Sequence, residues 1–306
     1  MGISQYIKEI GRGPRGSKPL TREQAADLFG QLLDGNVTDL EIGAFCLAMR
    51  IKGETPEEMC GFLGAAHSRM ALFPASDRPV IVLPSYNGAR KLPVLTPLLA
   101  LLLAREGLPV LLHGMRTEAR RTLASDVLLA LGVPALTAPE KIATGSVVHI
   151  ETGYLHAALA RLLKVREVVG LRNAGHSIVK LMNPCAGPAV VVTSYTHPEY
   201  YDMLQATFGA LHMTALLSRG LEGEVATDPR RTPRYDAFVA GVHQLLQEQQ
   251  PGTAADVPGL PTEIDIDTTA RYTQDVLDGR LPVPPALAQQ VEHILHLAAQ
   301  TPPHAP

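Results

Sequence analysis

Residues 80–91 read Val80-Ile81-Val82-Leu83-Pro84-Ser85-Tyr86-Asn87-Gly88-Ala89-Arg90-Lys91, an uninterrupted apolar run followed by a turn and two cations. A continuous apolar run is typical of a strand that is buried on both faces of a sheet. Asn-Gly is a strong turn signal, because both residues tolerate the backbone conformations of tight turns. The stretch therefore predicts a buried strand that ends in a loop, with a basic segment just beyond it.

The same pattern recurs along the chain. Apolar runs at 108–112, 147–150 and 189–193 are strand-like, and helix-like stretches such as 127–131 lie between them. Strands that alternate with helices predict an α/β fold with a mostly parallel sheet and helices on its faces. Such sheets bind ligands at the carboxyl ends of their strands. The segments after Leu83 and after Leu112 are therefore the candidate ligand loops.

The residues before this region read as several short helices. Three threonines have capping-box spacing, in which the hydroxyl and a side chain three residues on satisfy backbone N–H groups reciprocally. The pairs are Thr21 with Gln24, Thr38 with Glu41, and Thr55 with Glu58. Apolar residues follow at helical spacing, and Gly35 and Gly53 stand where helices should end. A small helical bundle is predicted.

These patterns predict two domains. Residues 1–75 are expected to form a helical domain that is completed by helices near 155–183. A linker would then lead to an α/β domain over residues 80–300, and residues 301–306 would form a disordered tail. A chain of 306 residues is long enough for both domains to bury cores.

Composition excludes several classes of protein. The longest apolar stretch, 92–104, is interrupted by prolines, and it is shorter than the roughly 20 apolar residues that span a bilayer. The first residues lack the apolar segment of a signal peptide. Cys46, Cys60 and Cys185 have irregular spacing that fits neither a disulfide framework nor a zinc site. We therefore expect a cytoplasmic protein with no membrane partner and no bound metal.

Charge is distributed unevenly, although the formal net charge is only −3. Residues 84–180 hold twelve Lys and Arg against six Asp and Glu, which gives a net charge of +6. Residues 1–83 have a net charge of −1, and residues 181–306 have a net charge of −8. A basic segment within an acidic protein favours an anionic partner over the other interpretation, a solvated surface that happens to be basic.

Two loops in the basic segment are candidate anion sites. They are Ser85, Tyr86, Asn87 and Gly88 with Arg90 and Lys91 behind them, and His113-Gly114 with Arg116, Arg120 and Arg121 behind it. A turn before a helix presents backbone N–H groups to an anion, and nearby Arg and Lys add charge. Either loop alone would be explained as a simple strand-to-helix turn. The two together favour a phosphate-binding edge.

The chain resembles a known family over nearly its whole length. The region from Leu28 to Thr55 is similar to the helical domain of the anthranilate phosphoribosyltransferases and the nucleoside phosphorylases. Four later matches are His113-Gly114-Met115-Arg116 with the family's Lys-His-Gly-Asn-Arg, Ser125 to Gly132 with its Ala-Asp-Val-Leu-Glu-Ala-Leu-Gly, Arg166 with its anthranilate-contacting arginine, and Asn183-Pro184 with its Asn-Pro. The resemblance implies the class III phosphoribosyltransferase fold, a small helical domain joined to a larger α/β domain.

Several positions depart from the family's pattern. The family cradles pyrophosphate in Gly-Thr-Gly-Gly-Asp, where this chain has Ser85-Tyr86-Asn87-Gly88, and side chains replace two glycines there. The family's magnesium-binding Asp-Glu pair falls on Val225-Ala226, with Glu222 and Glu224 nearby but out of register. The resemblance thus implies the fold but not anthranilate phosphoribosyltransferase activity, and we assign no catalytic residue.

The departures themselves resemble a divergent branch of the family, typified by the YbiB proteins. The matching segments are 84–91, 171–176, 194–200 and 220–225. This resemblance implies a homodimer that forms through the helical domain and binds nucleic acid.

The main hypothesis is therefore a protein that binds DNA or RNA largely without regard to sequence. The candidate phosphate-contacting cations are Arg90, Lys91, Arg116, Arg120, Arg121, Lys164, Arg166, Arg172 and Lys180. Because no recognition helix, zinc finger or RNA-binding aromatic motif is present, base readout is not expected. Tyr86 is either a stacking platform for a base or a packed turn residue.

The alternative is a phosphoribosyltransferase or other glycosyltransferase that acts on an unidentified small nucleophile. This alternative would need Mg²⁺ and phosphoribosyl pyrophosphate, whereas the main hypothesis needs no cofactor. A transferase needs only a local phosphate pocket, and a nucleic-acid binder needs a continuous basic track. The extent of the basic surface distinguishes the two.

Overall fold

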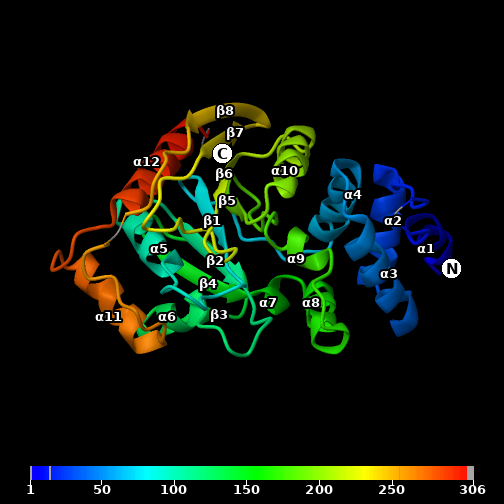
Figure 1. The fold of residues 1–306 in the computed structure, drawn as a ribbon, viewed down its shortest axis with the longest axis horizontal. Helices are drawn as coiled ribbons and strands as arrows, with labels where there is room; N and C mark the ends of the chain where they lie inside the picture. Colours follow the sequence, from blue (N-terminus) through cyan, green and yellow to red (C-terminus); the bar gives the residue numbers. More distant parts are fainter. Residues whose placement is uncertain (1, 14, 255, 302–306) are drawn as a thin grey trace.

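The computed structural model describes residues 2–13, 15–254 and 256–301. The first four helices form a bundle beside an α/β domain (Figure 1). These helices are α1 (Ser4–Ile10), α2 (Arg22–Leu33), α3 (Asp39–Lys52) and α4 (Pro56–His67). All three predicted capping boxes are present, and they begin α2, α3 and α4. The glycines expected at helix ends lie just after α2 and α3, both with positive φ.

Within the described residues the α/β domain is built on one eight-stranded sheet, in the order β3-β4-β2-β1-β5-β6-β7-β8. The strands are β1 (Val80–Pro84), β2 (Val110–Gly114), β3 (Ala135–Leu136), β4 (Val147–Glu151), β5 (Ala189–Tyr195), β6 (Ala215–Arg219), β7 (Tyr235–Val239) and β8 (Val242–Gln247). The strands from β3 to β6 in this order are parallel, and β7 and β8 extend the sheet antiparallel. The predicted α/β class with a mostly parallel sheet is confirmed.

The remaining helices follow the bundle in the chain and lie around the sheet. They are α5 (Thr96–Arg105), α6 (Ala124–Ala130), α7 (Thr152–Leu155), α8 (Ala157–Val169), α9 (Gly175–Ile178), α10 (Glu199–Ala210), α11 (Ile266–Leu277) and α12 (Pro285–Gln300). In Figure 1, α8, α9 and α10 lie between the sheet and the bundle. Both α9 and α10 contact α4.

The alternation within β1 explains how the two cores form. Val80 and Val82 pack in the core that the sheet shares with the bundle, while Ile81 and Leu83 pack with α5 and α12 on the other face. Every residue of β1 is buried, as the apolar run predicts for a strand covered on both sides.

The segment that leads from the bundle to β1 is held to the rest of the chain. Phe73 is fully buried and forms an isolated parallel β-bridge with Cys185. Of the expected tail, residues 302–306 lie outside the described residues, whereas Thr301 is buried and its hydroxyl donates to the carbonyl of Leu297. The three cysteines are free and buried. No helix in the described ranges is both long and apolar enough to cross a membrane.

Parallel strands place their carboxyl ends at one edge of a sheet. Pro84 of β1 is in register with His113 of β2, and Tyr195 of β5 is in register with Arg219 of β6. The segments 85–95, 115–123, 196–198 and 220–234 therefore leave the sheet side by side, and this edge is where the predicted ligand loops meet.

Candidate functional site

The loop after β1 donates its hydrogen bonds to a carboxylate of the same chain. Oε1 of Glu224 accepts from the backbone N–H groups of Asn87 (3.0 Å) and Gly88 (2.8 Å). Oε2 accepts from the hydroxyls of Ser85 (2.5 Å) and Thr96 (3.0 Å). Glu224 is only 4% exposed, and these four donors, together with the nearby charge of Lys180, compensate the burial of its carboxylate.

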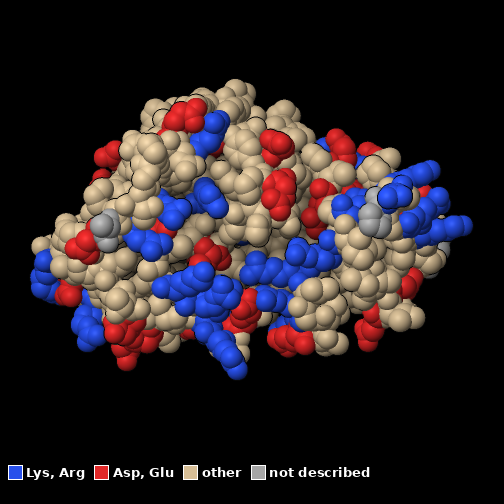
Figure 2. All heavy atoms as spheres, in the orientation of Figure 1, with Lys and Arg blue, Asp and Glu red and all other residues tan. Residues whose placement is uncertain are grey.

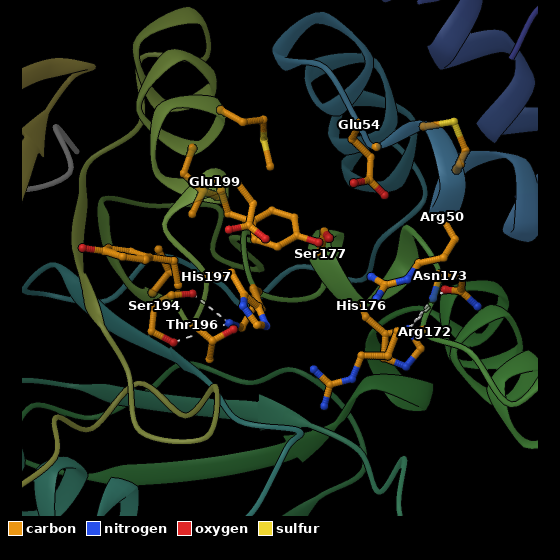
Figure 3. A pocket seen from close by; sticks show the side chains of 18 of the residues that line it. Arg50, Glu54, Arg172, Asn173, His176, Ser177, Ser194, Thr196, His197 and Glu199 are labelled. Carbon is orange, nitrogen blue, oxygen red and sulfur yellow. Dashed lines mark hydrogen bonds between the residues drawn. The ribbon is translucent and has the colours of Figure 1, made fainter. Parts of the chain in front are cut away.

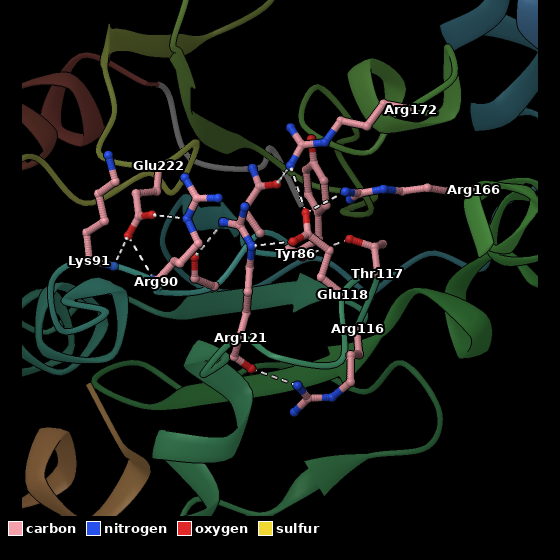
Figure 4. A network of polar contacts seen from close by, with 12 residues as sticks. Tyr86, Arg90, Lys91, Arg116, Thr117, Glu118, Arg121, Arg166, Arg172 and Glu222 are labelled. Carbon is pink, nitrogen blue, oxygen red and sulfur yellow. Dashed lines mark hydrogen bonds and ion pairs between the residues drawn. The ribbon is translucent and has the colours of Figure 1, made fainter. Parts of the chain in front are cut away.

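The next part of the same loop is bound by a second carboxylate. Oε2 of Glu222 accepts from the backbone N–H groups of Arg90 and Lys91, each at 2.9 Å (Figure 4). The expected phosphate-binding loop is thus formed, but its donors face internal carboxylates. This differs from the expectation of a loop open to an external anion.

Glycines allow these segments to approach closely. A Cβ on Gly223 would lie 2.1 Å from Nδ2 of Asn87, and the φ of Gly223 is +86°. A Cβ on Gly114 would lie 1.8 Å from the carbonyl oxygen of Ser85. Any side chain at either position would push the loops apart, so both positions require glycine. At Gly223 the positive φ is a second reason for glycine.

Because two carboxylates bind it from within the chain, residues 85–91 form a closed loop. A cation-lined groove lies beside this closed loop. It encloses about 600 Å³. Its basic residues are Arg90, Lys91, Arg121, Arg172, Arg219, Arg230 and Arg231. Its acidic residues are Glu222 and Asp228. Figure 2 shows Lys and Arg gathered in a broad band across the middle of this face, from the sheet loops toward the helical bundle.

The groove adjoins a second cavity of about 310 Å³ between the sheet edge and the bundle (Figure 3). Arg172, Thr196 and His197 line both cavities and so form the wall between them. Arg50 reaches the second cavity from the bundle, and Lys180 lines its wall. Basic residues are therefore found along the lining from the sheet loops to the helical domain, together with the carboxylates Glu54 and Glu199 in the second cavity.

Two buried groups of this second cavity have shifted pKa values. Burial, and to a lesser degree the nearby Arg172, lowers the pKa of Lys180 to about 8. Burial, with Arg172 and Arg166 adding to it, lowers the pKa of His176 to about 3, so this imidazole is neutral at pH 7. Lys180 donates to the carbonyl oxygen of Ser194 at 2.7 Å.

Glu118 forms ion pairs with several of the predicted cations (Figure 4). It lies 2.8 Å from Arg121, 2.6 Å from Arg166 and 3.8 Å from Arg172. Partial burial would raise the pKa of Glu118, but the hydrogen bonds from Arg121 and Arg166 lower it below its ordinary value. Part of the positive charge counted along residues 84–180 is thus compensated locally.

The structure brings some predicted site residues together and separates others. Arg90, Lys91, Arg121 and Arg172 line the groove, and Arg172 and Lys180 line the second cavity. Arg166 lies beside them on Glu118. Arg116 pairs with Asp126 instead, and Arg120 and Lys164 are exposed outside both cavities.

The structure decides the roles of three predicted site residues. The Arg121 side chain is only 10% exposed, because it is bonded to Glu118. Tyr86 is 3% exposed and packs edge-on against His176, so of its two predicted roles it has that of a packed turn residue. His113 was expected in a ligand loop, and this is corrected: it is fully buried in β2, which lowers its pKa to about 4.

Sequence reasoning missed other residues of the site. Arg219, Arg230 and Arg231 come from the acidic last third of the chain, and the charge count by segments could not single them out. The sequence marks Glu224 only as a neighbour of the positions where the family has its magnesium-binding residues. A carboxylate two residues from a second one, with a glycine between them, was the available signal.

The residues at this edge do not fit a magnesium pyrophosphate complex. Val225 and Ala226, at the positions of the family's metal-binding pair, are buried apolar residues. Across the part of the chain that the structure describes, no three or more His, Cys, Asp or Glu side chains are grouped to hold a metal ion. The loop donors that would face a phosphate are bonded to Glu224 and Glu222.

Comparisons of the sequence and of the structure with known proteins point to the same family. Residues 4–70 match the helical bundle domain of the glycosyl transferase family. The YbiB protein of Escherichia coli (strain K12) is 37% identical over 95% of this chain and 92% of its own length. The anthranilate phosphoribosyltransferase of Methylobacterium sp. (strain 4-46) is 29% identical over 90% of this chain and 82% of its own length.

Solved structures of the same transferase share the fold. The enzyme from Thermus thermophilus superposes with a TM-score of 0.73 at 21% identity, covering 97% of this chain and 87% of its own. The enzyme from Saccharomyces cerevisiae, in complex with PRPP and Mg, has a TM-score of 0.71 at 13% identity, covering 97% of this chain and 88% of its own.

A helical bundle joined to an α/β domain, with a ligand edge at the carboxyl ends of parallel strands, defines a phosphoribosyltransferase-like scaffold. The 37% sequence identity to YbiB over nearly the whole chain narrows the assignment to one branch of proteins with this scaffold. The chain belongs to the YbiB-like branch of the anthranilate phosphoribosyltransferase family.

Proposed function

We propose that the protein binds single- or double-stranded nucleic acid, largely without sequence preference, along the cation-lined groove. The observation that carries this proposal is the continuity of the basic lining. Seven Arg and Lys residues line the groove, where Glu222 lies near Arg90 and Asp228 pairs with Arg230 and Arg231. The lining continues through Arg172 into the second cavity and reaches Arg50 on the bundle. A local phosphate pocket needs no such extent, whereas a polyphosphate backbone does.

The salt dependence of binding tests this proposal. Each phosphate neutralised by a cation contributes about −0.7 to −0.9 to the logarithmic slope of affinity against salt. Changing Arg90, Lys91, Arg219 and Arg231 together to Glu removes exposed cations from the groove. We expect affinity for an oligonucleotide to fall by about 100-fold or more and the slope to become shallower by about 3.

A matched control changes the net charge equally outside the groove. Lys18, Lys141, Arg271 and Arg280 are exposed and line neither cavity. Changing these four to Glu should leave most of the affinity and the slope in place. If both quadruple variants bind as the wild type does, the groove is an ordinary basic surface and the proposal is wrong.

A transferase that acts on an unidentified nucleophile is the second candidate function. It is favoured by relatives named anthranilate phosphoribosyltransferase that match most of this chain. The carboxylates bonded to the loop weigh against it, because transfer from a pyrophosphate donor relies on loop N–H groups and metal to stabilise the leaving group. Complementation of a tryptophan auxotroph that lacks the transferase would support this candidate over ours.

We also propose that the protein forms a homodimer through the helical domain. Leu40, Ala44, Leu47 and Ile51 lie on one face of α3 at helical spacing, and all four are exposed, Leu40 by 85% and Ile51 by 58%. A two-fold contact would bury this stripe against itself. Light scattering should show a dimer that Ile51→Glu converts to a monomer, and a wild-type monomer at all concentrations would contradict the proposal.

A further inference from the structure

We propose that Lys180 is a nucleophilic amine that forms an imine with a phosphate-bearing aldehyde, bound in the cavity of about 310 Å³ between the sheet edge and the bundle. This covalent activity goes beyond the binding of nucleic acid proposed above, and it does not require that the groove bind a polymer. Two sources share the chemistry: a free sugar phosphate, and a sugar that has lost its base within a nucleic-acid strand.

The nitrogen of Lys180 contacts neutral oxygens only. It donates to the carbonyl oxygen of Ser194 at 2.7 Å and to the hydroxyl of Ser194 at 3.4 Å, and it forms no ion pair within the described residues. Lys52, whose side chain is 7% exposed, instead pairs with Glu58 at 2.6 Å. A neutral amine can make both of the contacts to Ser194 with its two hydrogens, which leaves its lone pair free to attack an electrophile.

The surroundings of Lys180 favour this neutral form. Burial and, to a lesser degree, the positive charge of Arg172 lower the pKa of Lys180 to about 8, although the carboxylate of Glu224 acts in the opposite direction. About a quarter of such amines are neutral at pH 7.5, compared with about one in a thousand for a lysine of ordinary pKa. Burial beside another cation is one of the ways in which proteins make a lysine nucleophilic.

The other ionisable residues that line the cavity come from both domains. They are Arg50, Glu54, Tyr86, His176, Tyr195, His197, Glu199 and Tyr200.

The arginines of the cavity suit a phosphate group. Figure 3 shows Arg50 and Arg172 on one side of the cavity and Ser194, the partner of Lys180, on the other. Arg172 is 36% exposed and lies 3.8 Å from Glu118, farther than Arg166 at 2.6 Å, so most of its charge is available to a ligand. A ligand held here would place an anion at the arginines and an aldehyde at the amine.

Polar side chains between these two ends suit the hydroxyls of a sugar. Ser177 and Thr196 line the cavity, and their hydroxyls have no hydrogen-bond partner within the described residues. His176 also lines it and is 3% exposed, and its Nε2 has no partner there either. Ligand sites usually enclose about 300–1,000 Å³, so a cavity of about 310 Å³ suits a small ligand such as a sugar phosphate.

The reaction needs no oxidant, reductant or metal ion. The lone pair of Nζ attacks the carbonyl carbon of the aldehyde and forms a C–N bond, which gives a hemiaminal. The bond between that carbon and its oxygen then breaks, and the oxygen leaves as water with the two protons of the neutral amine. The product is a C=N double bond between Lys180 and the former aldehyde carbon.

The first experiment incubates the wild type with 2-deoxyribose 5-phosphate, reduces any imine with cyanoborohydride, and measures the adduct at each lysine by peptide mass spectrometry. Lys52 is the buried, ion-paired control, and Lys141 is the exposed control. At pH 7.5 we expect Lys180 to react at least about tenfold faster than either control, with a rate that rises through pH 8. The sugar without its phosphate should react more slowly at Lys180.

The second experiment uses an oligonucleotide with one abasic site and the same oligonucleotide intact, each treated with borohydride and run on a denaturing gel. A covalent complex that needs the abasic site and is lost in Lys180→Met, but kept in Lys141→Met, would assign the aldehyde to a nucleic-acid strand. An adduct at Lys180 with the free sugar phosphate alone would assign it to a small molecule. Circular dichroism checks that both variants are folded.

The map of adducts on the wild type needs no variant, so it decides the matter even if Lys180→Met does not fold. Labelling that spares Lys180, or that is no faster there than at Lys52 and Lys141, would overturn the inference. The intact oligonucleotide forms no imine, so the salt dependence of its binding tests the groove separately.

Discussion

The loop after β1 and the groove beside it are built from the same edge of the sheet, yet they differ in what satisfies their polar groups. In the loop, backbone N–H groups are bonded to two carboxylates from residues 222–224. In the groove, arginines such as Arg219 and Arg231 retain exposed side chains beside a cavity of about 600 Å³. One part of the edge is closed by its own chain, and the other is open to a ligand.

This difference shows that two parts of one sheet edge can differ in which polar groups are left accessible to a ligand. The backbone donors that suit a compact phosphate group are internally satisfied. The cations of the groove are gathered next to them from four separate parts of the sequence, 90–91, 121, 172 and 219–231. Three further predictions test how sharply the closed loop and the open groove differ.

The largest expected effect is on stability, and it belongs to the closed loop. Glu224→Ala leaves four neutral donors without their acceptor, and because each buried unsatisfied donor costs about 1–3 kcal/mol, the variant should lose several kcal/mol of stability. Arg219→Ala in the groove should cost less than about 0.5 kcal/mol, as is usual for an exposed residue. Urea unfolding of both variants measures the difference. Similar losses for the two would show that the loop is no more tightly bonded than the groove.

The second effect is a pH dependence located beneath the closed loop. His113 is neutral when folded because burial lowers its pKa to about 4, and its ordinary value is 6.5. As pH falls from 6.5 to 4 the unfolded chain takes up a proton that the folded chain does not, so stability is lost across this window. The loss should approach about 2–3 kcal/mol.

Urea unfolding at several pH values checks this prediction. His113→Leu should remove most of the acid-sensitive slope, because an apolar side chain at this buried position takes up no proton. His296→Leu, at an exposed position of α12, should leave the slope unchanged. An unchanged slope in His113→Leu would mean that other groups cause the acid sensitivity.

The smallest effect should appear where the loop and the groove meet. Glu222 lines the groove while it holds the N–H groups of Arg90 and Lys91. Glu222→Gln removes one negative charge and retains an acceptor oxygen for the loop. Oligonucleotide affinity should rise by about two- to fivefold at low salt, and this gain should fade as salt screens the charge. A weaker complex would indicate that the carboxylate positions the groove instead of opposing its charge.

Local patterns in the sequence predicted the parts of the fold that depend on neighbours in the chain. The hydroxyl of Thr38 and the carboxylate of Glu41 are three residues apart, so their capping box can be recognised without knowing the fold. The run from Val80 to Leu83 likewise gives its strand directly. The antiparallel pair β7 and β8, by contrast, follows a long loop and carries no comparable run.

The site was less predictable, because its contacts join distant parts of the chain. Glu224 lies 136 residues after Gly88, and the sequence around each residue gives no signal of the hydrogen bond between them. Counting charge by segments located Arg90, Lys91 and Arg172, but it placed Arg219 and Arg231 in an acidic segment. It also counted Arg116 and Arg166 as available, although nearby carboxylates neutralise them.

The separation between the loop and its carboxylates also has a consequence for how the protein is made. During synthesis Asn87 and Gly88 leave the ribosome well before Glu224, which follows Gly88 by 136 positions in the chain. Until the connection after β6 has been translated, the N–H groups of the loop have only water or a passing anion as partners. Closure of this edge is therefore a late step of folding that must wait for a long-range contact. A nascent chain that ends after β6 therefore lacks both acceptors for these loop donors.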